Sequence, residues 1–148
     1  MKLSTKGRYG VRLMIDLASH FGEGPVLLRE ISEREEISEK YLWHLINPLK
    51  AAGLVTATRG AHGGYILAKP PSKITMKDIL RVLEGSLCLV DCVEKPSACN
   101  RAPICPARDM WSEIADGIDR ILITTTLADM AERQNAKREK QASGNYMI

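Results

Sequence analysis

Apolar residues recur at helical spacing in three stretches of the first fifty positions. Three helices are predicted on this basis, over about residues 6–21, 28–34 and 39–51. Ser4 and Thr5 can cap the first helix, and Ser38 is a natural N-cap for the third. Pro48 lies inside the third helix, where it removes a backbone donor, so we expect a kink or an early end there. Gly53 is expected to close that helix.

Two short β-prone runs follow, over residues 54–58 and 65–68, around the glycine-rich turn RGAHGG. This pattern predicts a β-hairpin. Thr75 and Asp78 then fit a capping box, which opens a further helix that ends at about Glu84. Three helices followed by a hairpin is the order of a winged helix-turn-helix, so the expected fold is mainly α, with a DNA-binding domain over residues 1–84.

The second half of the chain has a different pattern. Residues 85–107 are rich in Gly, Pro and Cys, show neither helical nor strand periodicity, and are expected to form a cysteine-rich loop. A long C-terminal helix is predicted from about Arg108 to Ile123, and Thr126 can cap a short terminal helix that ends near residue 135. Residues 136–148 are polar and are expected to be a disordered tail.

The long helix carries an apolar stripe whose members step 3-4-3, as in coiled coils. The stripe consists of Trp111, Ile114, Ile118 and Ile121, and Leu122 lies beside it. It can cover the same chain's core or the equivalent helix of a second copy. A helix that follows the DNA-binding unit and a loop has little core of its own left to cover, so we expect a homodimer.

Charge is distributed unevenly. The net charge is +3, and the first twelve residues hold Lys2, Lys6, Arg8 and Arg12 with no acidic residue. A basic end alone is usually a solvated surface, but it gains meaning beside a DNA-binding pattern. We therefore expect double-stranded DNA, with a pseudo-palindromic operator, as a partner.

The third helix is the candidate recognition helix, because a major groove accepts one helix. Its N-terminal half offers five candidate contacts: Ser38, Lys40, Tyr41, Trp43 and His44. Arg59 stands at the head of the hairpin turn, and arginine suits a narrow, electronegative minor groove. The competing interpretation makes these residues an ordinary solvent-facing surface.

All four cysteines fall in one segment, with the pattern C-x3-C-x6-C-x5-C at Cys88, Cys92, Cys99 and Cys105. The segment lacks the paired C-x2-C of zinc ribbons and the tight spacing of ferredoxins. An iron–sulfur cluster, zinc and a thiol redox switch all remain open, in that order. We expect a cytoplasmic protein, because no run of apolar residues resembles a signal peptide or a membrane span and thiols stay reduced in the cytosol. No catalytic arrangement stands out, so an enzyme is not expected.

Several separated motifs resemble the bacterial Rrf-type winged-helix regulators, which include IscR, NsrR and CymR. The resemblance covers about residues 1–130 and is carried by residues 1–10 (MKLSTKGRYG), 37–42 (ISEKYL), 53–55 (GLV) and 59–65 (RGAHGGY). The cysteine segment is most similar to that of the iron–sulfur cluster regulator IscR. The resemblance implies a transcription regulator, expected to control cluster biogenesis genes, whose recognition helix faces the major groove while Arg59 enters the minor groove.

The resemblance also implies that Cys92, Cys99 and Cys105 are thiolate ligands of a cluster, expected to be [2Fe–2S], with [4Fe–4S] as the alternative. Two family options for the fourth ligand are missing here. Arg108 stands where IscR-like proteins have a histidine, and Arg8 stands where NsrR-like proteins supply an acidic ligand. Cys88 is the remaining thiol and is the expected fourth ligand. The other interpretations are a repressor that senses nitric oxide or oxidation, and a CymR-like regulator that responds to a protein partner.

Overall fold

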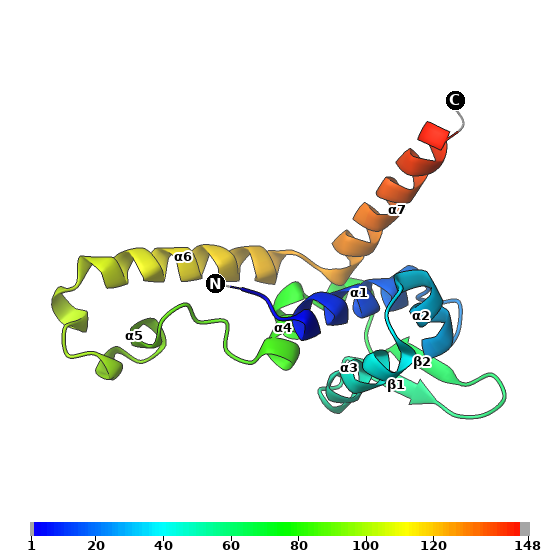
Figure 1. Cartoon of the computed structure of the whole chain (residues 1–148), viewed down its shortest axis with the longest axis horizontal. Helices are drawn as coiled ribbons and strands as arrows, with labels where there is room; N and C mark the ends of the chain where they lie inside the picture. Colours follow the sequence, from blue (N-terminus) through cyan, green and yellow to red (C-terminus); the bar gives the residue numbers. More distant parts are fainter. Residues whose placement is uncertain (1, 146–148) are drawn as a thin grey trace.

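A computed structural model describes residues 2–145, which form seven α-helices and one two-stranded antiparallel sheet (Figure 1). The winged part contains, in chain order, α1 (Thr5–Ser19), α2 (Leu28–Glu35), α3 (Glu39–Ala51), β1 (Val55–Thr58), β2 (Gly64–Leu67), the 3-10 turn η1 (Pro71–Lys73) and α4 (Met76–Glu84). The remainder contains α5 (Asp91–Glu94), the 3-10 turns η2 (Pro96–Ala98) and η3 (Ala102–Ile104), α6 (Pro106–Thr124) and α7 (Leu127–Asn145). The predicted mainly helical, winged architecture is confirmed.

The predicted caps set the ends of the helices. Ser4 Oγ accepts from the Gly7 amide at 3.1 Å, and Ser38 Oγ accepts from the Tyr41 amide at 3.2 Å. The third helix has the predicted bounds and runs through Pro48 to Ala51, so the early end expected there does not occur. It stops before Gly53, whose positive φ of 78° is a backbone conformation that glycine adopts without strain.

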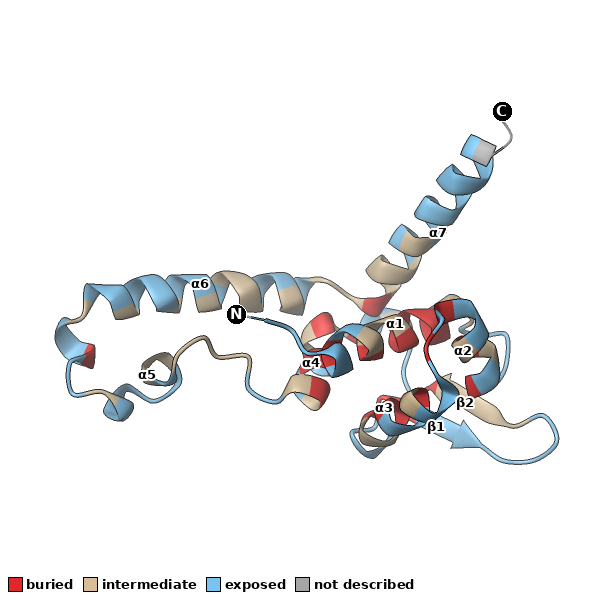
Figure 2. Cartoon of the chain, viewed as in Figure 1, coloured by how far each residue is buried: buried red, intermediate tan, exposed pale blue. Residues whose placement is uncertain are grey.

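The core lies where α1, α2, α3 and α4 meet, with the start of α7 packed on it (Figure 2). Its fully buried side chains come from every one of these helices, and include Leu13, Ile31, Leu42, Ile79 and Leu127. Apolar burial of this kind is the main force that holds the winged part together.

One buried ion pair ties α2 to α1. Asp16 is fully buried, and Arg34 donates to its two carboxylate oxygens from Nε and Nη2, both at 2.8 Å. This bidentate hydrogen bond raises the pKa of Arg34 above its ordinary value. The pair fixes the helix-turn-helix on α1, because a buried carboxylate is stable only when it is fully partnered.

The wing is a short ladder in which Val55 pairs with Leu67 and Thr58 with Gly64. β2 is anchored near the turn to the segment before α2, where Val26 and Tyr65 exchange two backbone hydrogen bonds of 2.9 and 2.8 Å. A Cβ at Gly64 would lie 2.6 Å from the Val26 carbonyl oxygen, so only glycine permits this approach.

Beyond α4 the chain leaves the core. Residues 85–107 were expected to be an irregular loop, but they contain α5, two 3-10 turns and the first two residues of α6. This segment and α6 run side by side and extend away from the winged part (Figure 1). Ala102 is the only buried residue described between positions 85 and 124. We call residues 85–124 the arm.

The C-terminal prediction was wrong. The expected short helix and disordered tail are one long helix, α7, as far as Asn145. The backbone N–H of Thr126 donates to Asp129 Oδ2 at 2.9 Å, and the Asp129 N–H donates to Thr126 Oγ1 at 3.1 Å, which caps the first turn. The last three residues of the predicted tail, 146–148, lie outside the described residues. Among the described residues, no helix combines the length and the apolar character that a membrane span requires.

Candidate DNA interface and cysteine segment

The outer face of α3 is free of contacts with the core. Lys40, Trp43 and His44 are exposed, and the indole of Trp43 is 52% accessible although it is a large apolar group. The Trp43 ring meets the His44 ring edge to face, with centroids 5.5 Å apart. Ser38 is exposed at the start of this face, although its hydroxyl already caps the helix. Lys40, Trp43 and His44 therefore share one solvent-facing surface in the N-terminal half of the helix.

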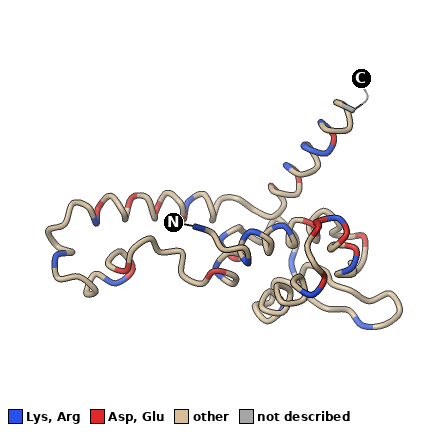
Figure 3. Tube along the Cα trace, in the orientation of Figure 1, with Lys and Arg blue, Asp and Glu red and all other residues tan. Residues whose placement is uncertain are grey.

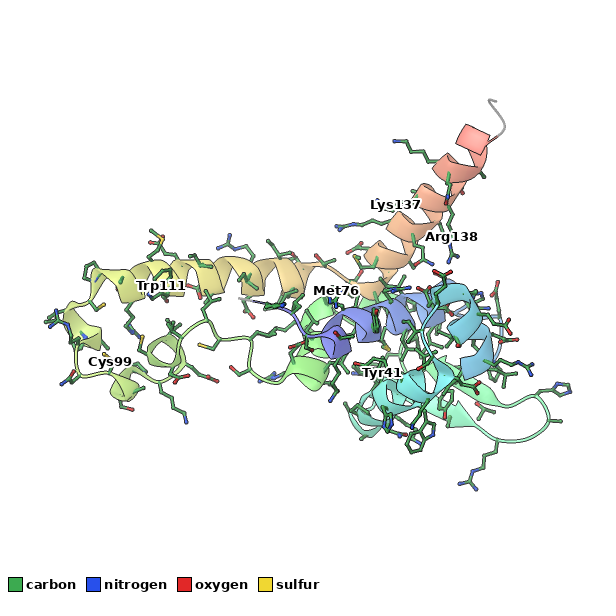
Figure 4. All side chains as sticks on the ribbon, in the orientation of Figure 1. Tyr41, Met76, Cys99, Trp111, Lys137 and Arg138 are labelled. Carbon is green, nitrogen blue, oxygen red and sulfur yellow. The ribbon has the colours of Figure 1, made fainter. Side chains whose placement is uncertain are left out.

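Tyr41 differs from its neighbours. It lies on α3 (Figure 4) and is half-buried, and its ring packs edge-on against Tyr9 of α1, with centroids 5.9 Å apart. The guanidinium of Arg12 lies 5.4 Å from the centre of the Tyr9 ring. Tyr41 thus holds α3 against α1 besides standing at the edge of the recognition face.

Basic side chains mark two further places. Arg59 is exposed in the turn of the wing, and Lys2 is exposed before α1 (Figure 3). The turn that carries Arg59 depends on Gly60, whose φ is +106°. An exposed helix therefore lies between a positively charged wing and a positively charged N-terminus. This arrangement is expected of a protein that binds double-stranded DNA.

The four cysteines are free and half-buried, but the fold does not place them equally. Cys88 lies near the end of α4, donates from Sγ to the Val90 carbonyl oxygen at 2.8 Å, and lines a cavity of about 530 Å³ together with Ile118 and Leu122. Cys99 lines a different cavity, beside Arg108 at the beginning of α6. Arg108 and Ile118 are ten residues apart on one helix, or roughly 15 Å at 1.5 Å per residue. The structure therefore does not bring Cys88 to Cys99.

Within residues 2–145, no three His, Cys, Asp or Glu side chains converge as a ready metal site. The chemistry of the donor set still fits an iron–sulfur cluster, because Cys92, Cys99 and Cys105 are free thiols on short turns with little packing. Arg108, which stands at the expected ligand position, donates from Nε to the Cys92 carbonyl oxygen at 2.9 Å. It fixes the backbone of the segment and offers no lone pair to a metal.

The predicted stripe on α6 is divided between two sides of the helix. Ile118 and Leu122 line cavities shared with Leu87 and Cys88 of the same chain, and Leu122 also packs on the core. Trp111, Ile114 and Ile121 are exposed, with Ile121 65% accessible.

The exposed side also carries Met110, which is 52% accessible, and Gly117, beside which there is open space. Neither residue belongs to the predicted stripe, although Met110, Ile114, Gly117 and Ile121 step 4-3-4 along the sequence and this spacing marks a second stripe. We call these four residues the free stripe.

An exposed helix on a helix-turn-helix, a charged wing and a projecting arm define a DNA-binding transcription regulator. The comparisons with known proteins agree. The family model Rrf2, described as an iron-dependent transcriptional regulator, matches residues 3–133, and the chain belongs to this family.

The relatives are transcription regulators and not enzymes. The HTH-type transcriptional regulator CymR of Bacillus subtilis is 43% identical over 139 residues, which are 94% of this chain and 96% of CymR. The solved structure of B. subtilis CymR, titled the global cysteine regulator, superposes with a TM-score of 0.78 at 44% identity, covering 90% of this chain and 98% of that one. The structure of T. potens IscR gives a TM-score of 0.74 at 46% identity, covering 90% of this chain and 88% of IscR. The chain is thus similar to both the CymR and the IscR regulators, and not to IscR alone.

Proposed function

We propose that this regulator senses an iron–sulfur cluster bound by Cys92, Cys99 and Cys105 and binds its operator as a homodimer. The observation that carries the proposal is the cysteine segment itself. Three free, half-exposed thiols lie on short turns outside the core, where a change in ligation can alter the segment without unfolding the winged part.

When bound, a cluster would supply a redox-active and oxygen-labile group that responds to the state of the cell. The chain's own residues would bind the cluster and limit the movement of the segment around it. The three thiols would be deprotonated and drawn together, and Arg108 would keep its hold on the Cys92 carbonyl and so limit how far that turn can move. Cys88 is a weak candidate for the fourth ligand, because its thiol faces the joint between α4 and α6.

For DNA, we propose that α3 enters the major groove with Ser38, Lys40, Trp43 and His44 at the base edges. Arg59 would enter the adjacent minor groove, and Lys2 would contact a phosphate. Trp43 and His44 offer an apolar surface and one imidazole, so contact with thymine methyl groups is expected on this helix.

The dimer is proposed to form through α6. The free stripe has no partner among the described residues, and Gly117 at its centre allows a second helix to come close. Two copies joined in this way would present two recognition helices to one operator, as the half-sites of such operators require.

The test is the visible spectrum of protein purified without oxygen, with iron and sulfide counted per chain. The proposal predicts a coloured protein, and loss of the colour in Cys92→Ser, Cys99→Ser and Cys105→Ser. Cys88→Ser is the matched control and should keep the cluster. A colourless wild-type protein that cannot be reconstituted with iron and sulfide would refute cluster sensing. Bleaching by nitric oxide, with air causing little change, would identify nitric oxide as the signal.

A second candidate is a regulator that uses its thiols or a protein partner without a cluster. Two observations favour it: the high identity to CymR, and the absence of a converged ligand group in residues 2–145. Under this alternative the protein is colourless as isolated. Operator binding then responds to a thiol oxidant or to an added protein partner, and not to iron and sulfide.

A further inference from the structure

We propose that Glu84, the last residue of α4, is a positioning residue that fixes the N-terminal DNA-contacting segment and links it to the cysteine segment. The inference rests on the proposed role of Lys2 at the DNA and goes beyond it. It names the joint through which the arm and the DNA-binding surface act on each other.

Glu84 completes the cap of α1. Its Oε1 accepts hydrogen bonds from the backbone N–H of Ser4, at 3.1 Å, and from the Ser4 hydroxyl, at 2.5 Å. The same hydroxyl accepts from the Gly7 amide, so the helix cap and the Glu84 carboxylate form one continuous network. A carboxylate at this end of a helix also complements the partial positive charge of the first turn.

The packing is built around this side chain. A Cβ at Gly7 would lie 2.0 Å from Glu84 Oε1, and a Cβ at Gly10 would lie 2.1 Å from Leu83 Cδ1. The two glycines therefore let the first turns of α1 lie directly on the end of α4. Because Ser4 is held in this way, Lys2 and Leu3 are carried to the wall of the cavity that Glu84 and Cys88 also line.

The cysteine segment starts at the next residue. Gly85 turns the chain here with a φ of +77°, a backbone conformation that glycine adopts without strain. Ser86 Oγ then donates to Glu94 Oε2 at 3.2 Å and accepts from the Cys88 amide at 3.2 Å. Glu94 is the last residue of α5, which also contains Cys92. A continuous path of hydrogen bonds and backbone thus runs from the cysteine turns, through Ser86 and Glu84, to the start of α1.

The first experiment compares the operator binding of Glu84→Ala with that of Glu84→Gln. Both remove the same charge, but glutamine keeps a carbonyl oxygen that can accept from Ser4. Glu84→Ala should weaken operator binding at low salt by about tenfold and lower the slope of log affinity against log salt by about one, as the loss of one phosphate contact does. Glu84→Gln should stay within about twofold of the wild type, because a charge-free acceptor suffices for these hydrogen bonds.

Glu23→Ala, in the exposed turn after α1, controls for the loss of one negative charge and should leave the slope unchanged. Glu84→Asp keeps the charge but is one methylene shorter, and it replaces Glu84→Ala if that variant does not fold. An unchanged slope, or equal losses in the alanine and glutamine variants, would overturn the positioning role.

The second experiment tests the link between the cysteine segment and the start of α1, and it needs no cluster. Alkylation of the thiols with iodoacetamide should speed hydrogen exchange of the amides of residues 5–8 severalfold in the wild type and in Glu84→Gln. In Glu84→Ala the exchange should already be fast and should not change on alkylation. Unchanged exchange in the alkylated wild type would overturn the link, whatever the spectrum shows about iron. If the protein fails to bind a cluster, the expected results of both experiments stay the same.

Discussion

The winged part and the arm are built on opposite principles. Residues 5–84 bury side chains from every helix, whereas α6 has no buried residue and the segment before it has only Ala102 (Figure 2). The winged part is therefore held together by a buried core, to which the start of α7 adds Leu127. The arm exposes Met110, Trp111 and Ile121, and carries four free thiols, so it gains its stability from what binds to it.

The largest expected effect is on the arm's free stripe. Ile121→Glu places a charge at its most exposed apolar position, and we expect monomers in light scattering and a loss of operator affinity of about a thousandfold, the scale that separates specific from non-specific binding. Ile123→Glu is the matched control. Ile123 is 47% exposed and lies about 200° further around the helix, so this variant should remain a dimer with normal affinity. A dimeric Ile121→Glu would show that the copies meet elsewhere.

Within the winged part, Arg34→Ala should lower the free energy of unfolding by about 3 kcal/mol, because the buried carboxylate of Asp16 loses both hydrogen bonds from Arg34 and keeps only His20 Nδ1, 3.6 Å away. Arg12→Ala breaks the pair between Arg12, whose side chain is 43% exposed, and Glu35, and should cost less than Arg34→Ala because Arg12 is better solvated. Urea unfolding measures both. Similar losses for the two variants would mean that the Asp16 pair does not govern the stability of this region.

At the DNA surface, Arg59→Ala should weaken specific binding by about 1–3 kcal/mol and relax the preference at the base pairs beneath the wing. Lys2→Ala should instead lower the salt slope by about one with little change in preference among sequences. Fluorescence anisotropy over a range of salt concentrations separates the two. If both variants changed only the slope, the wing would be a phosphate anchor.

The smallest effect concerns α7. The pKa of Asp129 is lowered, chiefly by the hydrogen bond that its carboxylate accepts from the Thr126 backbone N–H and then by the Thr126 side chain beside it. The cap therefore stabilises the helix above the ordinary pKa of aspartate, and this contribution is lost as the pH falls through the lowered value. Helicity of the wild type should decline slightly more than that of Asp129→Asn on acidification, as circular dichroism would show. If helicity fell equally in the two proteins on acidification, the Asp129 carboxylate would not stabilise α7.

The winged part could be predicted closely from the sequence, because its signals are local. Ser38, Gly53 and the pair Thr75 and Asp78 mark helix ends through hydrogen bonds and backbone angles that neighbouring residues determine alone. The long α7 was missed because its second half has no apolar period. Alanine, arginine, glutamine, glutamate and lysine favour helix by intrinsic propensity, and that signal was available in its sequence.

The arm could be predicted only in outline. The long helix that carries the stripe is present as α6, but the division of Ile118 and Leu122 from Ile114 and Ile121 depends on where the preceding segment packs. The distance of Cys88 from Cys99 likewise follows from the path of the arm and not from the spacing of the cysteines. Nothing local to either residue encodes it.

In this account, the cysteines of the arm control the affinity of the winged part for DNA. The most direct test is the affinity of the protein for an operator selected from random DNA, measured without oxygen before and after the cluster is removed by air or chelation. We predict a change of at least tenfold in the wild type and none in Cys99→Ser, which should behave as the cluster-free protein throughout. Equal affinities with and without the cluster, in a wild-type protein shown to bind iron and sulfide, would contradict this account.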